Sequence, residues 1–354
     1  MARLALVMIA RDEARCIARA LESVRPHVDR MVVLDTGSTD ATPEIASGLG
    51  AEVGRFDWCD DFAAARNAAL EMADADWVLM LDADEWLEGA AAALGPQTLL
   101  ASPAAPFLGL ARVRSEIAPA DGEAGVAASW IARVLPRGVR YAGRIHEQPV
   151  STLPQRRLAL AIGHDGYLPD ALARKAGRNE ALLRREIAEA PGDAYLWLQL
   201  GRELQVRGRA AEAADAFARA CELCPPNAPY RHGLVVRAIP AFKTAERFDE
   251  AMALADAELP RWQASPDFFF VVGDLYLEWA SRNPDRAIKD FLPIVEYAWK
   301  KCLEIGERDD LDGSVKGRGG FMAAYNLAIM FETFGLDQQA GEYQALAERL
   351  RPAA

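Results

Sequence analysis

The chain has 354 residues, of which 51% are apolar, and a formal net charge of −12. A chain of this length can bury the cores of about two domains. The excess negative charge repels phosphate backbones and anionic lipid, which argues against nucleic acid as a partner.

Targeting and membrane signals are not evident in the sequence. The N-terminal stretch MARLALVMIARDEARC has charged residues after a short apolar run, where a signal peptide would have small residues before its cleavage site. We find no run of about 18 apolar residues, the length that a spanning helix needs. An odd number of cysteines, five, does not resemble a secreted disulfide framework. We therefore expect a cytoplasmic protein without a transmembrane segment.

The sequence CELC at 221–224 has the spacing of half a zinc site, but no second cysteine pair or nearby histidine completes four ligands. We interpret these cysteines as core-facing thiols on a helix.

Short apolar runs alternate with amphipathic helical patterns up to about residue 170, which is typical of an α/β domain with a mostly parallel sheet. We predict strands at 4–10, 30–37, 51–58 and 77–86, and helices at 12–24, 42–50 and 60–74, the second with Thr42 as its N-cap. Further strands are predicted at 107–115, 128–137 and 139–150, in a less regular lobe.

The second half of the chain, from about residue 171, has a helical pattern with an internal repeat. The spacing of a tetratricopeptide repeat is met by Trp197, Leu200, Gly201, Leu204, Gly208, Ala213, Phe217, Ala220 and Pro225. A weaker copy runs from Leu327 to Pro352. Because such hairpins bury their faces only by stacking, we predict a short α-solenoid. It is either a structural or dimerising appendage, or a groove that holds a polypeptide.

The stretch DWVLMLDADEW, residues 76–86, runs from an apolar strand into Asp82, Asp84 and Glu85. In open α/β sheets, ligands bind beyond the carboxyl ends of the strands. Two carboxylates at such an end suit a hydrated divalent cation that a diphosphate also ligates. A calcium loop does not fit, because Trp86 and Leu87 occupy positions that need an oxygen ligand and a glycine. A solvated loop end is the remaining alternative.

A further acid, Asp35, follows the second predicted strand in VVLDTGSTDAT, where a turn or helix-cap aspartate is also common. The first strand-to-helix turn, MIARDEA, has no glycine, which excludes the glycine-rich loop of dinucleotide-binding folds. A metal would therefore have to hold the phosphates of a nucleotide.

Taken in order, LALVMIARDEARCIARALESV, VVLDTGSTDAT, FAAARNAAL and WVLMLDADEW resemble the nucleotide-binding half of glycosyltransferase family 2 enzymes, which have the GT-A fold. YAGRIHEQPV and IGHDGY resemble a subset that includes bacterial lipopolysaccharide-core glycosyltransferases and peptide S-glycosyltransferases, and the latter also carry tetratricopeptide-like C-termini. The resemblance implies a GT-A nucleotide-diphospho-sugar transferase domain over 1–170 and a tetratricopeptide-like helical domain over 171–354.

The resemblance implies that Asp35 contacts the base or ribose of a nucleotide, with Ala10 and Glu13 lining the same pocket. Arg66 would lie near the base and the diphosphate, although an exposed helix arginine is the alternative. The chain has Arg11-Asp12-Glu13 where the family often has Lys-Asn-Glu, and Thr36 where it often has a second aspartate.

The resemblance also implies a site for Mn²⁺ or Mg²⁺. Asp82 would reach the ribose and the metal shell, and Asp84 would bind the metal directly. Related enzymes recruit a C-terminal histidine as an additional ligand, for which His164 is the first choice and His146 the second; a structural role is the alternative for both.

The resemblance predicts an inverting, metal-dependent transfer of a hexose from a UDP-sugar to a Cys, Ser or Thr side chain of a peptide or protein. Glu147, or else Asp165, would take the proton of the acceptor. A lipopolysaccharide or other glycan acceptor is one alternative. A non-catalytic nucleotide-binding scaffold, or a homodimer formed through the repeats, remains open as well.

Overall fold

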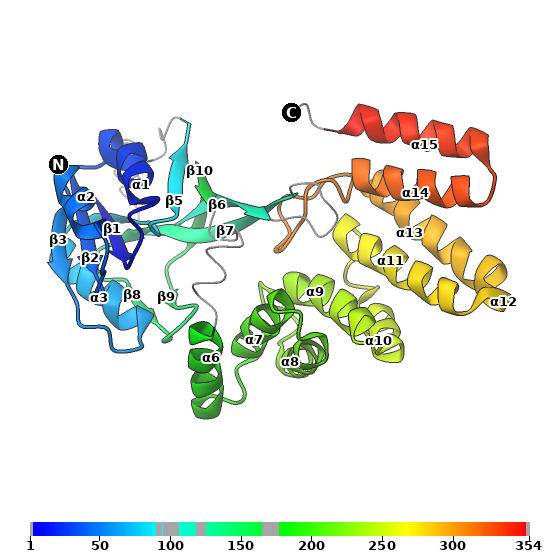
Figure 1. Ribbon diagram of the computed structural model, residues 1–354, viewed down its shortest axis with the longest axis horizontal. Helices are drawn as coiled ribbons and strands as arrows, with labels where there is room; N and C mark the ends of the chain where they lie inside the picture. Colours follow the sequence, from blue (N-terminus) through cyan, green and yellow to red (C-terminus); the bar gives the residue numbers. More distant parts are fainter. Residues whose placement is uncertain (1–2, 90–93, 95–105, 118–124, 165–176, 352–354) are drawn as a thin grey trace. The chain divides into compact units, whose positions relative to one another are not determined.

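The computed structural model describes residues 3–89, 94, 106–117, 125–164 and 177–351, without the side chains of 115–117 and 125–128. The chain divides into two compact units, Met1–Glu186 and Ile187–Ala354 (Figure 1). Helix α6 (Arg178–Glu189) crosses this division. The predicted division at residue 170 lies outside the described residues.

The first unit contains an eight-stranded mixed sheet with the strand order β3-β2-β1-β4-β7-β6-β10-β5. Its strands are β1 (Leu4–Ala10), β2 (Arg30–Asp35), β3 (Glu52–Arg55), β4 (Trp77–Met80), β5 (Glu85–Glu88), β6 (Leu108–Ile117), β7 (Gly125–Pro136) and β10 (Gln155–His164). β1, β2, β3 and β4 run parallel, β7 is antiparallel to β4 and β6, and β5 is antiparallel to β10. A separate hairpin joins β8 (Arg140–Ala142) to β9 (Gln148–Val150).

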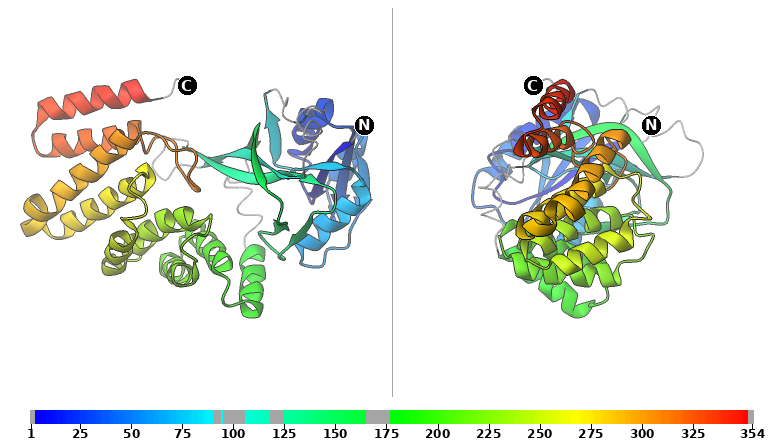
Figure 2. Two further views of the ribbon diagram at one scale, coloured as in Figure 1. Left: turned by 180° about the vertical axis from the view of Figure 1, so that it is seen from behind. Right: turned by 90° about the vertical axis from the view of Figure 1, so that its right-hand side faces the viewer.

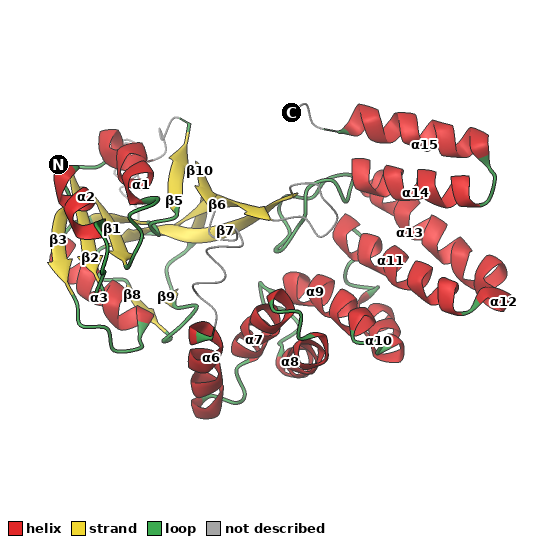
Figure 3. Ribbon diagram, viewed as in Figure 1, coloured by secondary structure: helices red, strands yellow, loops and turns green. Residues whose placement is uncertain are grey.

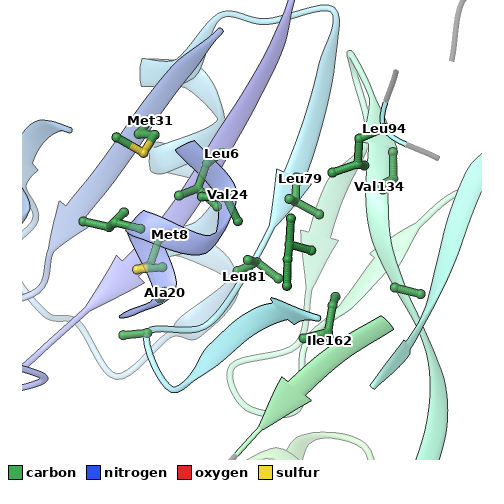
Figure 4. Close-up of a cluster of buried hydrophobic side chains, with 14 of the residues drawn as sticks. Leu6, Met8, Ala20, Val24, Met31, Leu79, Leu81, Leu94, Val134 and Ile162 are labelled. Carbon is green, nitrogen blue, oxygen red and sulfur yellow. The ribbon is translucent and has the colours of Figure 1, made fainter. Parts of the chain in front are cut away.

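Helices cover both faces of this sheet, as the alternation of side chains along the strands requires. Leu6 and Met8 of β1 face α1 (Ile17–Val24) and α2 (Thr42–Gly48), whereas Val7 faces α3 (Phe62–Ala73). Figure 4 shows the first of these two cores, in which Ala20 and Val24 of α1 lie over the strands. Because β1, β2, β3 and β4 run in the same direction, their carboxyl ends lie at one edge of the sheet.

The predicted strand 77–86 is wrong in its extent. β4 ends at Met80, and β5 begins at Glu85 and pairs with β10 at the far edge of the sheet. Asp82 and Asp84 lie in the tight turn between the two strands, in which the backbone N–H of Glu85 donates to the carbonyl of Asp82 at 3.0 Å. The acids therefore follow β4 at the carboxyl edge of the sheet, as the sequence predicted, but within a closed turn.

Two other predictions need correction, and one strand is absent from the predicted elements. Thr42 is the first residue of α2, not its N-cap, and its hydroxyl contacts Asp40 and the backbone of Glu13. The predicted strand 139–150 is the β8–β9 hairpin. Strand β10 was not predicted, although it carries His164 at its end.

The second unit is all-helical, and its helices pack as successive antiparallel hairpins (Figures 2 and 3). After α6 come α7 (Ala194–Val206), α8 (Ala210–Leu223), α9 (Arg231–Thr244), α10 (Phe248–Glu258), α11 (Pro266–Arg282), α13 (Leu292–Ile305), α14 (Phe321–Thr333) and α15 (Asp337–Leu350), with the short α12 (Pro284–Arg286) and a π-helical segment (Ala287–Phe291) before α13. The helices described in either unit include none that is both long and apolar enough to cross a membrane.

The predicted repeat is confirmed in α7 and α8. A Cβ atom added at Gly201 would lie 2.8 Å from the ring of Phe217, so the absence of a side chain on α7 makes room for the aromatic residue of α8. Gly208 has a φ of +70° in the turn between the two helices, a conformation that favours glycine. The C-x-x-C cysteines lie at the end of α8, where Cys224 is buried and both are free thiols.

Candidate active site

The ends of β1 and β2 form the first part of the candidate site. Ala10 and Asp35 are opposite each other in the parallel register, and both are buried. The carboxylate of Asp35 accepts hydrogen bonds from the backbone N–H groups of Gly37 and Ser38 at 3.1–3.2 Å. Asp35 therefore shapes the turn after β2, and its predicted contact with a nucleotide would have to be made in addition to these bonds.

The loops after β1 and β2 are joined by side chains of both. Thr42 accepts the backbone N–H of Glu13 at 2.8 Å, and Asp12 accepts the backbone N–H of Thr39 at 2.7 Å. The carboxylate of Glu13 also contacts the thiol of Cys16 at 3.2 Å. Asp12 has a φ of 55°, a conformation that non-glycine residues rarely adopt. Glu13 is thus held beside the ends of both strands, where a nucleotide pocket was predicted.

Arg66 of α3 is buried, so the alternative of an exposed helix arginine does not hold. Its Nη2 donates to Asp82 at 2.6 Å, its Nε donates to Glu147, and its guanidinium carbon lies 5.5 Å from the ring centre of Tyr141. Burial opposes the charged form, but Asp82 and Glu147 raise the pKa of Arg66 well above its ordinary value. Nη1 is buried without a hydrogen-bond partner.

Arg133 of β7 is a second buried arginine of the site, which the sequence analysis missed. Its Nη2 donates to Glu85 and, at 3.2 Å, to Asp82. Burial favours the protonated form of Asp82, but the positive charges of Arg66 and Arg133 outweigh it and hold the pKa of Asp82 well below its usual range. Burial raises the pKa of Glu85 to about 7, against the opposing effect of Arg133.

Glu147 reaches Arg66 because the β8–β9 hairpin is attached to α3. The side-chain amide of Asn67 donates to the carbonyl of Tyr141 at 2.9 Å and accepts its backbone N–H at 2.8 Å. Gly143 and His146, in the loop between β8 and β9, have φ values of 96° and 51°. A non-glycine residue with a positive φ, such as His146, is often found in a functional loop. The hairpin thus connects Glu147, the predicted general base, to Arg66, which is predicted to lie near the base and diphosphate of a nucleotide.

Asp84 and His164 meet at the other side of the 82–85 turn. His164 Nε2 lies 3.7 Å from Asp84 Oδ2, and His164 is opposite Glu85 in the antiparallel pairing of β10 with β5. Next to this pair, the ring of Trp86 fills the space above Gly163, where no Cβ atom could fit. Asp165 lies outside the described residues.

The predicted metal ligands are only partly brought together. Asp82 directs both carboxylate oxygens to arginines, and His146 lies in the β8–β9 loop. Within the described ranges, no three His, Cys, Asp or Glu side chains form a group that could hold a metal ion. The carboxylate of Asp84 and the imidazole of His164 are nevertheless donors that Mn²⁺ accepts, and phosphate oxygens and water can supply the remaining ligands.

Acids, arginines and a histidine lie at the carboxyl edge of the parallel strands, which is where α/β domains with an open sheet bind their ligands. Residues 5–91 match the model of Glycosyl transferase family 2, so this segment of the first unit has the sequence pattern of a family 2 glycosyltransferase domain. An all-helical region with tetratricopeptide-like repeats follows it.

Three curated relatives are similar to parts of this chain. A TPR repeat-containing protein of Synechococcus elongatus is 38% identical over 230 residues, which are 59% of this chain and 54% of that protein. The SPbeta prophage-derived glycosyltransferase SunS of Bacillus subtilis is 27% identical over 59% of this chain and 50% of its own length. An uncharacterized glycosyltransferase of Rickettsia felis is 39% identical over 25% of this chain and 30% of its own length. The chain spans about half the length of the first two relatives.

Proposed function

We propose that the protein is a metal-dependent, inverting glycosyltransferase that moves a sugar from a UDP-sugar to a Cys, Ser or Thr side chain of a peptide or protein. The observation that carries the proposal is the meeting of Asp84 and His164 beside a buried pair of arginines, at the carboxyl edge of a glycosyltransferase family 2 domain. The similarity to the glycosyltransferase SunS, over 59% of this chain, supports the choice of a glycosyl donor.

In the proposed site, Asp84 and His164 hold a divalent cation, Mn²⁺ or Mg²⁺. A cation held there would supply Lewis-acid chemistry, by neutralising the charge of the diphosphate that leaves with the nucleotide. Asp35, Glu13 and Ala10 line the nucleoside part of the pocket. Arg66, oriented by Asp82 and Glu147, presents a guanidinium to the same region.

Glu147 is the proposed general base. The acceptor hydroxyl or thiol attacks the anomeric carbon from the face opposite the diphosphate, so the configuration inverts, and Glu147 takes the acceptor proton. A positioned base of this kind typically accelerates transfer by about 10²- to 10⁴-fold. Its ion pair with Arg66 fixes the carboxylate on the hairpin loop before the acceptor arrives.

The proposal is tested by calorimetry with UDP, GDP, TDP and ADP in the presence and absence of Mn²⁺, together with a screen of nucleotide sugars for metal-dependent hydrolysis. We expect UDP to bind best and one UDP-sugar to be hydrolysed slowly without an acceptor. A preference for guanosine or thymidine diphosphate would overturn the donor assignment. Binding without any hydrolysis would favour a scaffold.

The repeats are proposed to dock the acceptor or to join two copies of the chain. A fragment of residues 1–189, which ends with α6, should hydrolyse the donor slowly but lose transfer to the natural acceptor. Sedimentation of the full chain distinguishes dimer formation from acceptor docking. Full transfer by the fragment would exclude a role of the repeats in catalysis. If the full chain transfers sugar to a glycan but not to peptides, the acceptor belongs to the lipopolysaccharide class.

A further inference from the structure

Arg133 lies at an irregularity of the sheet that turns its side chain toward the acidic turn. On β7, Val134 is opposite Gly109 of β6, but the next pair joins Ala132 to Leu110, so Arg133 is the extra residue of a β-bulge. Bulges redirect side chains and are frequent beside active sites. On its other side, β7 pairs with β4 up to Val134 and Leu79, which brings Arg133 to the end of β4.

The turn that Arg133 contacts is closed at both ends. The backbone N–H of Glu85 donates to the carbonyl of Asp82 at 3.0 Å, and the backbone N–H of Asp82 donates to the carboxylate of Glu85 at 3.0 Å. The Nη2 atom of Arg133 donates to the carboxylates of both residues. One guanidinium thus ties the first and last residues of the turn that carries Asp84.

Stability alone does not account for this arrangement. Arg133 is 8% exposed, and its Nε is buried without a hydrogen-bond partner, so its burial leaves part of the desolvation cost uncompensated. Apolar residues in place of a buried ion pair are often neutral or stabilising in proteins. Both contacts are made by the one Nη2 atom, which the rigid plane of the guanidinium holds in place between the two carboxylates, whereas the ammonium group of a lysine ends a flexible stem.

We propose that Arg133 is a positioning residue, which bridges Asp82 and Glu85 and so aims the Asp84 carboxylate toward His164 for binding of the divalent cation and the donor diphosphate. The inference rests on the proposed function and deepens it. Asp82 then acts mainly as an anionic centre between Arg66 and Arg133, and Asp84 carries the direct contact with the cation.

The test compares Arg133→Lys, which keeps the charge, with Arg133→Met, which keeps much of the volume. Arg137→Met is the matched control, because Arg137 follows the same strand but is exposed and pairs with Asp74 at 2.5 Å, away from the turn. Each variant is titrated with UDP by calorimetry, with saturating Mn²⁺ and with EDTA, and its unfolding is measured without ligand.

We expect both Arg133 variants to weaken Mn²⁺-dependent UDP binding at least tenfold, with Arg133→Lys folded at the wild-type melting temperature within a few degrees. UDP binding in EDTA should change little, and the Arg137→Met protein should bind as the wild type does. The result that supports the inference is thus a folded Arg133 variant that has lost the gain in UDP affinity that Mn²⁺ gives the wild type.

Two results would overturn the inference and leave the proposed function standing. One is a folded Arg133→Lys protein that binds UDP in the presence of Mn²⁺ as tightly as the wild type does. The other is a loss of UDP affinity in Arg133→Lys that is equal with Mn²⁺ and with EDTA. If Arg133→Met does not fold, Arg133→Lys alone decides. A wild-type protein that binds no UDP in the presence of Mn²⁺ would instead overturn the proposed function, and this inference with it.

Discussion

The Nε2 atom of His164 lies 3.7 Å from a carboxylate oxygen of Asp84, which joins the end of β10 to the turn that follows β4. The contact exists because β5 leaves that turn and pairs with β10, so that Glu85 and His164 are opposite each other. A carboxylate and an imidazole are two of the donors that the proposed divalent cation would need.

Replacement of His164 by alanine should leave the melting temperature of the ligand-free protein nearly unchanged. The side chain is part of a polar contact at a strand end and not of either apolar core. Mn²⁺-dependent nucleotide binding should weaken, because the proposed cation would lose one of its two protein ligands. Thermal melts and calorimetry check this, with His27→Ala as the control, since His27 precedes β2 at the opposite edge of the sheet. A large loss of stability with intact binding would assign His164 a structural role.

The Asp84→Asn variant should be as stable as the wild type without metal, or slightly more stable. Asp82, Asp84 and Glu85 are clustered, so removal of one negative charge relieves repulsion. The variant should lose the stabilisation that Mn²⁺ and UDP give the wild type by mass action, together with donor hydrolysis. A turn or cap aspartate would instead cost about 1 kcal/mol of stability and leave binding intact.

Glu85→Gln is the matched control for Asp84→Asn, because its amide oxygen can still accept from Arg133 and from the backbone of Asp82. It should largely keep the stabilisation by Mn²⁺ and UDP. Metal-dependent hydrolysis by Asp84→Asn, measured beside this control, would exclude Asp84 as a required ligand.

The stability of the metal-free protein should fall as the pH rises from about 4.5 to 7. Burial raises the pKa of Glu85 from 4.5 to about 7, so the folded chain keeps a proton that the unfolded chain releases within this window. The contribution is on the order of 1–3 kcal/mol. Asp82 affects this profile only at more acidic pH, because its pKa is lowered and the stabilisation by its charged form is lost only when the carboxylate is protonated. In chemical denaturation at several pH values, Glu85→Gln should show a flatter profile, and parallel profiles would contradict the assignment.

Local patterns predicted the parallel half of the sheet, because β1, β2 and β4 are buried on both faces and appear as continuous apolar runs. The break between β4 and β5 was not predictable in this way. It depends on the turn at 82–85 and on the pairing of β5 with β10, which is a contact between distant segments. β10 itself has an irregular burial pattern with exposed residues at its start, and its alternation is correspondingly weak.

The two buried arginines of the site differ in how far the sequence predicts them. Arg66 was identified through the resemblance, but its burial between Asp82 and Glu147 depends on the β8–β9 hairpin, which only the structure shows. Arg133 was overlooked, although it stands within the apolar run WIARVLP, where a charged residue needs a buried partner. An arginine inside such a run was the signal that could have found it.

The last prediction concerns the contact between the helices of the confirmed repeat. Gly201→Ala should destabilise the second unit, because the added methyl group meets the ring of Phe217 at 2.8 Å and that ring is fully buried. Overpacking of this kind costs about 1–3 kcal/mol, which outweighs the gain of about 1 kcal/mol that alanine brings to a helix interior. Gly341→Ala is the control, since Gly341 lies in α15 with nothing within 4 Å of an added Cβ atom. In chemical unfolding followed by circular dichroism, Gly201→Ala should therefore lower the midpoint and Gly341→Ala should raise it slightly. Equal shifts of the unfolding midpoint in the two variants would mean that α7 and α8 do not pack through Gly201. The close contact of Gly201 with Phe217 would then no longer support a tetratricopeptide-like hairpin.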